Sequence, residues 1–379
     1  MPRIIMNLVL CMLLTSFHSR AQKNDLFRQE LNEVMEKYQT VGLAFAVVKD
    51  NKIVYQEAIG NKNLERKEDL KIDNLFRIAS ISKSFTATAL MQLVDQKKIS
   101  LDDDFGDLIG FPIRNPKFPN TVITLRMILS HTSSINDKNG YFELDVIHPT
   151  KNKSWEKSYN DYEPGTSYQY CNLNFNMAGA VLERLTNIRF DKYIHQQIIA
   201  PLKLNAGYNI DALDSSAFAT IYDFNRSENK FIPQPAAYLS RKQAFKNYRI
   251  GESTPIFSPT GGMKISAPDL AKYMIMHMNY GRAEKTRILS KKSAQEMQKP
   301  VAIAKGYGLA LHEKLDILEN IRLIGHTGSA YGLYSSMFFH PEEKYGFVVI
   351  TNGCIPIYEG ENLLLTKSVI QLLHRYYIE

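Results

Sequence analysis

The chain has 379 residues, of which 44% are hydrophobic and 22% are charged, so it can bury a large core in one domain or two. Its formal charge of +7 is small for this length, and Lys and Arg are scattered without a run of five or more. A nucleic-acid-binding tract is therefore not expected. The sequence also contains no internal repeat or low-complexity segment.

The N-terminus has the pattern of a Sec-type signal peptide. Arg3 precedes an apolar run over residues 4–14, and the small residues Ser19 and Ala21 precede a cleavage point at Gln22. The run is too short to cross a membrane comfortably. Cleavage would remove two positive charges and lower the formal charge from +7 to +5. We expect an exported protein, periplasmic or secreted, with no stable membrane span after cleavage.

Cysteine usage indicates neither a disulfide framework nor a metal centre. Removal of the signal peptide would leave Cys171 and Cys354, which could form one bridge in an oxidising compartment. We favour two free, buried thiols. The chain has no Cys-x-x-Cys and no His-Glu-x-x-His, so a zinc site has no support.

The first part of the mature chain predicts a helix, a β-hairpin and a second helix. The helix covers residues 25–38, the hairpin strands are 41–48 and 53–59, and the second helix covers 76–94. The middle of the chain is different in character. It combines a capped helical turn at 124–129, a long polar and aromatic loop at 136–166 that we expect to form one side of a cleft, and helices at 173–185, 190–199 and 270–279.

Strand patterns return near the C-terminus and precede a last amphipathic helix. The expected strands are 307–311, 322–324, 334–339 and 346–351, and the helix is 360–377. The most economical arrangement is an α+β fold, in which both ends of the chain build one antiparallel sheet flanked by the terminal helices. We expect one domain over 22–379, with an α/β lobe at about 22–85 and 300–379 and an inserted all-helical lobe at about 86–299.

Ser80 and Lys83 form the first candidate catalytic pair. Ser80 lies near a predicted helix N-terminus, where free N–H groups and the helix dipole favour negative charge. Lys83 is one helical turn further and can reach the hydroxyl. A lysine can activate serine when burial lowers its pKa. Ser-x-x-Lys also begins at Ser154 and Ser227, where no periodic helix follows, so the pattern alone commonly marks a solvated helix face.

Tyr170-Cys171-Asn172 supplies a second candidate motif directly before a predicted helix. Tyr170 could shuttle protons if nearby cations lower its pKa. Asn172 could donate a hydrogen bond to a substrate amide. The alternative interpretation is a packed tyrosine followed by a helix-capping asparagine.

Gly325-His326-Thr327-Gly328-Ser329 is the third motif and follows the predicted strand 322–324. A sheet edge with Thr327 and Gly328 would let a substrate backbone lie alongside as an extra strand. The backbone N–H groups of Ser80 and Ser329 would then stabilise an oxyanion. The alternative is an ordinary turn.

Together these motifs resemble the serine β-lactamase and penicillin-binding-protein superfamily, and most closely its class C β-lactamase-related hydrolases. That branch includes D-alanyl-D-alanine carboxypeptidases, D-peptidases and some esterases. The resemblance spans about residues 25–375. It rests on FRIASISK (76–83), YCN (170–172) and HTG (326–328), with accessory stretches LSHTSS (129–134), PGT (164–166), PL (201–202), TGGM (260–263) and YGL (307–309).

The resemblance implies a role for each motif residue and a β-lactamase/transpeptidase-like fold with the site between two lobes. Ser80 would be the acylated nucleophile and Lys83 its base or electrostatic partner. Tyr170 would protonate the leaving group and help to activate the deacylating water. Asn172 and the segment His326-Thr327-Gly328 would bind substrate. No metal or organic cofactor is implied. The expected partner is a small molecule or short peptide, with peptidoglycan fragments among the candidates.

One departure from the pattern affects the expected substrate. Class C β-lactamases typically carry lysine where this chain has His326, and an unperturbed histidine is mostly uncharged near neutral pH. We therefore expect a D-peptidase or esterase rather than an efficient β-lactamase.

Cys171 and Ser134 also replace common residues without removing a catalytic group. No Gly-x-Ser-x-Gly elbow is present, which disfavours an α/β-hydrolase. A catalytically inactive binder of cell-wall peptides is the alternative from another functional class.

Overall fold

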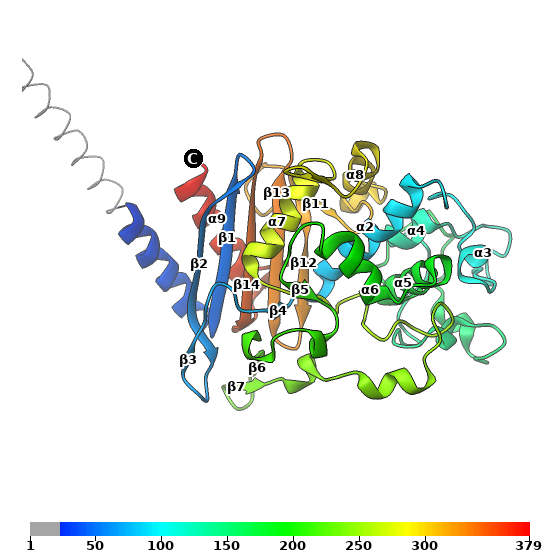
Figure 1. Cartoon of the computed structure of the whole chain (residues 1–379), viewed down its shortest axis with the longest axis horizontal. Helices are drawn as coiled ribbons and strands as arrows, with labels where there is room; N and C mark the ends of the chain where they lie inside the picture. The colour runs from blue at the N-terminus through cyan, green and yellow to red at the C-terminus, as the bar shows by residue number, and fades with distance from the viewer. Residues whose placement is uncertain (1–22) are drawn as a thin grey trace, which may run out of the picture.

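The computed structural model describes residues 23–379, so the predicted signal peptide lies outside the described residues. A seven-stranded antiparallel sheet has the order β11-β12-β13-β14-β1-β2-β3. Its strands are β1 (Gly42–Lys49), β2 (Lys52–Asn63), β3 (Glu68–Asp69), β11 (His312–Lys314), β12 (Leu323–Ala330), β13 (Leu333–His340) and β14 (Tyr345–Gly353). Strand β1 pairs with β14, so segments from both ends of the chain lie side by side (Figure 1). The predicted α+β architecture is confirmed.

Each face of the sheet carries its own hydrophobic core. Successive side chains of a strand point to opposite faces, so Ala44 and Ala46 of β1 join one core while Leu43 and Phe45 join the other. The first helix (23–37) and α9 (Leu364–Tyr377) cover the second face. Helix α7 (Ala267–Met278) lies on the first face.

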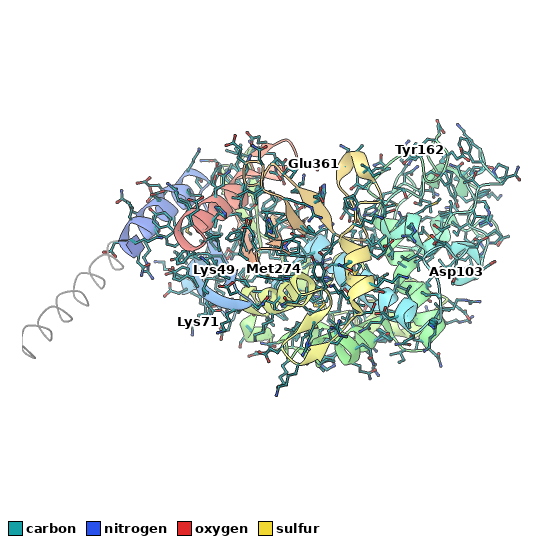
Figure 2. The ribbon with its side chains drawn as sticks, turned by 90° about the horizontal axis from the view of Figure 1, so that it is seen from above. Lys49, Lys71, Asp103, Tyr162, Met274 and Glu361 are labelled. Atoms are coloured by element: carbon teal, nitrogen blue, oxygen red, sulfur yellow. The ribbon has the colours of Figure 1, made fainter. Side chains whose placement is uncertain are left out.

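The helical lobe lies beside the sheet, on the right of Figure 1. Its helices are α2 (Ser82–Asp95), α3 (Phe105–Ile109), α4 (Leu125–Leu129), α5 (Asn172–Thr186), α6 (Phe190–Ile194) and α8 (Lys291–Gln298). Figure 2 shows Asp103 and Tyr162 in this lobe, at the opposite end of the molecule from Lys49. None of the helices within 23–379 is long and apolar enough to cross a bilayer.

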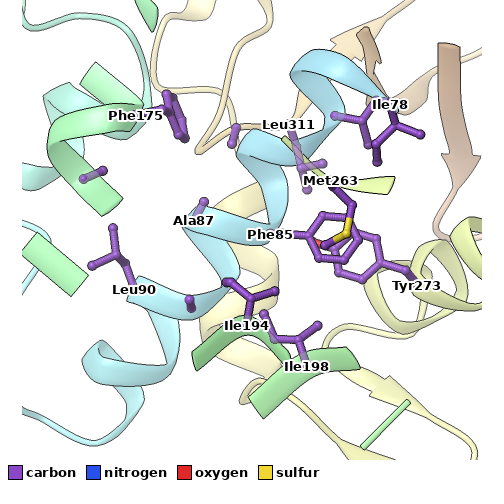
Figure 3. Close-up of a cluster of buried hydrophobic side chains, with 14 of the residues drawn as sticks. Ile78, Phe85, Ala87, Leu90, Phe175, Ile194, Ile198, Met263, Tyr273 and Leu311 are labelled. Carbon is purple, nitrogen blue, oxygen red and sulfur yellow. The ribbon is translucent and has the colours of Figure 1, made fainter. Parts of the chain in front are cut away.

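Helix α2 is the central helix of the first core. Its sequence spacing predicts one buried face, but the structure buries it on nearly every side, among side chains such as Phe175, Ile194 and Leu311 (Figure 3). Phe85 stacks on Tyr273 with ring centroids 3.7 Å apart. Hydroxyl-bearing residues can be buried here because each finds a hydrogen-bond partner; Thr86, for example, donates to the Pro259 carbonyl at 2.8 Å, and Ser82 accepts from the Met263 N–H. A helix this enclosed gives the residues at its N-terminus a rigid support.

The short elements connect these layers. Strands β4 (Phe76–Arg77), β8 (Lys264–Ile265) and β5 (Ala206–Gly207) form one small sheet, and β6 (Tyr222–Asn225) with β7 (Lys230–Pro233), β9 (Arg282–Ala283) with β10 (Thr286–Arg287), and β15 (Tyr358–Glu359) with β16 (Asn362–Leu363) form three hairpins. The loop predicted over 136–166 contains only the 3₁₀ turns η2 (Leu144–Ile147) and η3 (Trp155–Ser158).

Several predicted boundaries are wrong. The helix predicted from residue 76 begins at Ser82, after β4 and the 3₁₀ turn η1 (Ala79–Ile81). Residues 307–311 do not form a strand, because Gly308 N–H bonds back to Leu311 and Ala310 has φ of 57°. The last helix begins at Leu364 rather than 360. The helix predicted over 190–199 is confirmed in its bounds, as α6 followed by the π-helical turn η4 (His195–Ile199).

Candidate active site

Ser80 lies in the tight turn η1, immediately before α2. Ala79, just before it, has a left-handed φ of 46°. An L-residue in that conformation costs about 1–2 kcal/mol, so the surrounding packing must maintain this turn. The Ser335 hydroxyl, on β13, donates to the Ile78 carbonyl at 3.0 Å and ties the turn to the sheet. The structure thus fixes Ser80 where the sheet and the helical lobe meet.

Lys83 is fully buried beneath Ser80. Its Nζ lies 3.0 Å from Ser80 Oγ, 2.9 Å from Asn172 Oδ1 and 3.0 Å from the Thr260 carbonyl oxygen. Burial lowers the pKa of Lys83 to about 7, although the negative charge of Asp137 opposes this change. A large fraction of Lys83 is therefore a neutral amine near neutral pH and can accept a proton from Ser80.

The Tyr170 ring lies 4.8 Å from Lys83 Nζ, and its hydroxyl oxygen is buried. The hydroxyl lies beside Ser80, but the two do not form a hydrogen bond of ordinary geometry. Burial raises the pKa of Tyr170 above its usual value, and the Ser80 hydroxyl only partly opposes that effect. The expectation that nearby cations lower this pKa is therefore wrong, because desolvation dominates. Tyr170 stays protonated and can act as a proton donor.

The Asn172 side chain is held on both sides. Its Oδ1 accepts hydrogen bonds from Lys83 and from the Thr260 hydroxyl, and its Nδ2 donates to the Asp137 carboxylate at 3.0 Å. Asn172 lines the cavity, and both acceptor positions of its Oδ1 are used by Lys83 and Thr260. Its Nδ2 carries two N–H groups, of which one donates to Asp137, so the other can donate to a substrate amide.

The motif Gly325–Ser329 lies inside β12 and does not follow it, since β12 continues to Ala330. His326 is buried, and its Nε2 lies 3.0 Å from the Tyr307 hydroxyl. Burial, reinforced by the positive charge of Lys83, lowers the pKa of His326 to about 3. His326 is therefore uncharged at physiological pH, where an unperturbed histidine would still be charged in a small fraction of molecules. It offers no positive charge to a substrate.

The free edge of β12 faces the site. On one side β12 pairs with β13 through to Ala330, while on the other side β11 pairs only with residues 323–325 of β12. Within the described chain, the edge beyond Gly325 is thus open to an additional strand. Thr327 and Ser329 are exposed there, while the Gly328 Cα faces the turn before Ser80, where an added Cβ would lie 2.2 Å from the Ile78 carbonyl oxygen.

A cavity of about 750 Å³ joins these elements. The predicted site residues that line it are Ser80, Tyr170, Asn172, His326, Thr327 and Ser329. Lys83 lies beneath Ser80 and Gly328 lies behind the strand edge, so three distant segments converge on one hydroxyl. In the part of the chain that the structure describes, no group of three or more His, Cys, Asp and Glu side chains is arranged to hold a metal ion.

Comparison with known proteins identifies the family that shares this arrangement. The family described as Beta-lactamase matches residues 27–362. The chain belongs to the Beta-lactamase family. Members of this family are generally serine hydrolases that act on amide or ester bonds, which agrees with a buried lysine beside an accessible serine.

The names of similar proteins refer to several different activities. Protein flp of Staphylococcus aureus (strain MRSA252) is 22% identical over 350 residues. The match covers 86% of this chain, which spans only 63% of the length of that relative. Penicillin-binding protein 4 of Amycolatopsis lactamdurans is 25% identical over 86% of this chain and 84% of that protein. The solved structure of EstCE1, described as a hydrolase with promiscuous acyltransferase activity, has a TM-score of 0.72 at 19% identity, covering 93% of this chain and 99% of that one. At that identity the likeness shows the fold alone.

Four residues that contact the site of this Beta-lactamase family chain were not assigned to it from the sequence. They are Asp137, His131, Thr260 and Tyr307. The last three lie in accessory stretches to which no role was assigned. His131 packs its ring 4.3 Å from that of Tyr170, and its Nδ1 accepts the Cys171 N–H. For Asp137, the available signal was indirect: helix α5 begins after Cys171, a residue that caps helices poorly.

Proposed function

We propose that this Beta-lactamase family member is an exported serine hydrolase that forms an acyl-enzyme at Ser80. Its substrate would be a D-amino-acid peptide, an ester or a β-lactam amide. The observation that carries the proposal is the 3.0 Å contact between Lys83 Nζ and Ser80 Oγ, together with a Lys83 pKa of about 7. A lysine with that pKa can act as a base at neutral pH.

Acylation would begin when Ser80 Oγ attacks the substrate carbonyl carbon and its proton passes to Lys83. The carbonyl oxygen becomes an oxyanion, which the backbone N–H groups of Ser80 and Ser329 would stabilise. When the bond to the leaving group breaks, that group takes a proton from the Tyr170 hydroxyl. Lys83 then returns its proton to Tyr170, and the charges balance. Water would release the acyl group from Ser80 by the same transfers in reverse.

The open edge of β12 supports an extended substrate. A peptide-like acyl chain could lie along Thr327 and Ser329 as an additional strand and bind through backbone hydrogen bonds. His326 adds no positive charge beside this edge. Many β-lactams carry a carboxylate. A substrate whose affinity depends on pairing such a carboxylate with a cation at this edge should bind weakly.

The test is covalent labelling of Ser80. The mature protein should react with a fluorophosphonate probe or a fluorescent penicillin, and mass spectrometry should place the adduct on Ser80. Ser80→Ala should abolish labelling, and Ser154→Ala should not, since Ser154 has the same spacing to a lysine but is half-buried beside an exposed Lys157. Folded protein without an adduct at Ser80 would disprove the proposal and favour a non-catalytic binder of cell-wall peptides.

Substrate preference is tested by comparing kcat/KM for nitrocefin, a p-nitrophenyl ester and a D-Ala-D-Ala peptide. Because His326 is uncharged, we expect the ester or the peptide to exceed nitrocefin by at least about tenfold. Nitrocefin as the best substrate would instead favour a true class C β-lactamase.

Export rests on the N-terminal sequence. The charged Arg3 and the apolar run after it support a signal peptide that ends at Ala21. Protein recovered from the periplasm or medium should begin at Gln22, which N-terminal sequencing or intact mass can establish. Recovery of an uncleaved chain in the cytoplasm would contradict this localisation.

A further inference from the structure

We propose that Asp137 is a positioning residue that holds Asn172 and Lys83 in the arrangement needed to deprotonate Ser80. This inference rests on the proposed function, since it concerns the base of that reaction. Asp137 lies outside the three motifs, 35 positions before Asn172 in the chain. Its carboxylate nevertheless reaches the start of α5, directly beneath the site.

Four donors converge on the Asp137 carboxylate. The backbone N–H groups of Asn172 and Leu173 donate at 2.8 and 2.9 Å, Asn172 Nδ2 donates at 3.0 Å, and the Cys171 thiol lies at 3.2 Å. The N-cap residue of α5, Cys171, forms no side-chain cap of its own. Asp137 therefore caps this helix from another segment, and its negative charge is favourable at the helix N-terminus.

The bond to Asn172 determines which way its carboxamide faces. A carboxylate only accepts hydrogen bonds, so the amide nitrogen of Asn172 must point at Asp137. The amide oxygen is then turned toward Lys83 Nζ at 2.9 Å. If the amide were reversed, its N–H groups would face the donors of Lys83, and Asp137 would face an oxygen.

This orientation directs the lone pair of neutral Lys83. A neutral amine has two N–H groups and one lone pair in a tetrahedral arrangement. The Asn172 Oδ1 and Thr260 carbonyl oxygens, at 2.9 and 3.0 Å, can each accept one N–H. The third direction points at Ser80 Oγ, 3.0 Å away, and carries the lone pair that accepts the serine proton. Asp137 thus acts on the base through Asn172.

The charge of Asp137 has a second effect on the same base. Burial lowers the pKa of Lys83 to about 7, and Asp137 is the largest influence in the opposite direction. The other groups that face Lys83 are Tyr170, Phe175, the uncharged His131 and His326, and the Cys171 thiol, whose pKa is raised by burial. Removal of the Asp137 charge should therefore move the Lys83 titration to lower pH.

The experiment compares pH profiles of acylation in the full mature protein. In Asp137→Asn, kcat/KM for a p-nitrophenyl ester should fall at least about tenfold, because the neutral amide no longer forces the Asn172 orientation. Its acid limb should also move down by roughly half a unit to one unit. Asp104→Asn is the matched control. Asp104 is also a carboxylate helix cap, on α3 away from the cavity, so its loss should lower Tm without moving the limb.

Asp137→Glu is the second variant, in case Asp137→Asn does not fold. It keeps the charge, so its acid limb should stay within about 0.3 unit of the parent limb. Its kcat/KM should fall at least about fivefold, because a longer side chain cannot meet both backbone N–H groups and the Asn172 amide in the same geometry.

The outcomes separate the two proposals. A parent protein that never acylates overturns the proposed function and this inference with it. An active parent whose folded Asp137→Asn variant keeps the same acid limb and rate overturns the inference alone. A folded Asp137→Glu variant with unchanged kcat/KM does so as well. A lower rate combined with a displaced limb in Asp137→Asn, but not in Asp104→Asn, supports the positioning role.

Discussion

At the scale of single residues, burial decides the chemistry of this site. Lys83, Tyr170 and His326 all lie in a region with little water, and in each the form with less charge is favoured. The same desolvation gives three different results. Lys83 is largely a neutral amine near neutral pH, Tyr170 stays protonated, and His326 is an uncharged partner of Tyr307.

These shifts predict a pH profile with a single acid limb. The pKa of Lys83 is lowered to about 7, so below that pH Lys83 is an ammonium ion that cannot accept the Ser80 proton. kcat/KM for an ester should fall about tenfold for each unit below the limb and level off above it. His326, whose pKa is about 3, should add no limb near neutrality. The measurement is kcat/KM between about pH 5 and 9 at constant ionic strength.

Two outcomes would count against this account. A flat profile across that range would mean that Lys83 does not titrate there or is not the base. A limb retained in folded Lys83→Met, with residual activity, would assign the titration to another group.

At the scale of elements, the close contact between β12 and the turn before Ser80 depends on Gly328. A Cβ at this position would lie 2.2 Å from the Ile78 carbonyl oxygen, which belongs to backbone and cannot move independently. Gly328→Ala should therefore separate β12 from η1. We expect a stability loss of about 1–3 kcal/mol and a fall in kcat/KM of about 10–100-fold, because the Ser80 hydroxyl and the strand edge shift relative to each other.

Gly261→Ala is a matched control for this prediction. Gly261 also lies beside Ala79, but a Cβ there would have its nearest neighbour at 3.7 Å, an ordinary contact. Urea unfolding and ester kinetics on both variants make the comparison. Equal effects of the two substitutions would show that Gly328 has no special steric role.

The same contact explains where sequence reasoning succeeded and where it did not. Apolar runs bounded by turn residues located the hairpin, helix α5 and the C-terminal strands, although β1 and β14 prove to be buried on both faces. The same reasoning ended β12 too early, since Gly325 and Gly328 resemble turn residues locally, and only the close approach of η1 and β13 explains them. It also missed Asp137, because a cap supplied from 35 positions away leaves no local pattern.

At the scale of the whole molecule, the sheet lies between the core beside the cavity and a second core that we expect to contribute to stability but not to activity. Ser80 and the cavity lie with the core that contains Ile78 and Phe85, whereas the two terminal helices pack on the other face. Phe27 of the first helix is fully buried there, against Phe45 at 6.2 Å and Tyr377 at 5.3 Å between ring centroids. The terminal helices should therefore hold the fold together without shaping the site.

Phe27→Ala tests this separation. Removal of a fully buried aromatic side chain should lower the free energy of unfolding by about 3–5 kcal/mol, while kcat/KM of the folded fraction stays within about twofold of the parent value. Leu26→Ala is the control, since Leu26 is 49% exposed and its loss should change stability by less than about 0.5 kcal/mol. Chemical denaturation and ester kinetics at low temperature measure both quantities. A large loss of kcat/KM in folded Phe27→Ala would mean that the sheet transmits packing changes from one face to the other, and the two cores could then not be treated as independent.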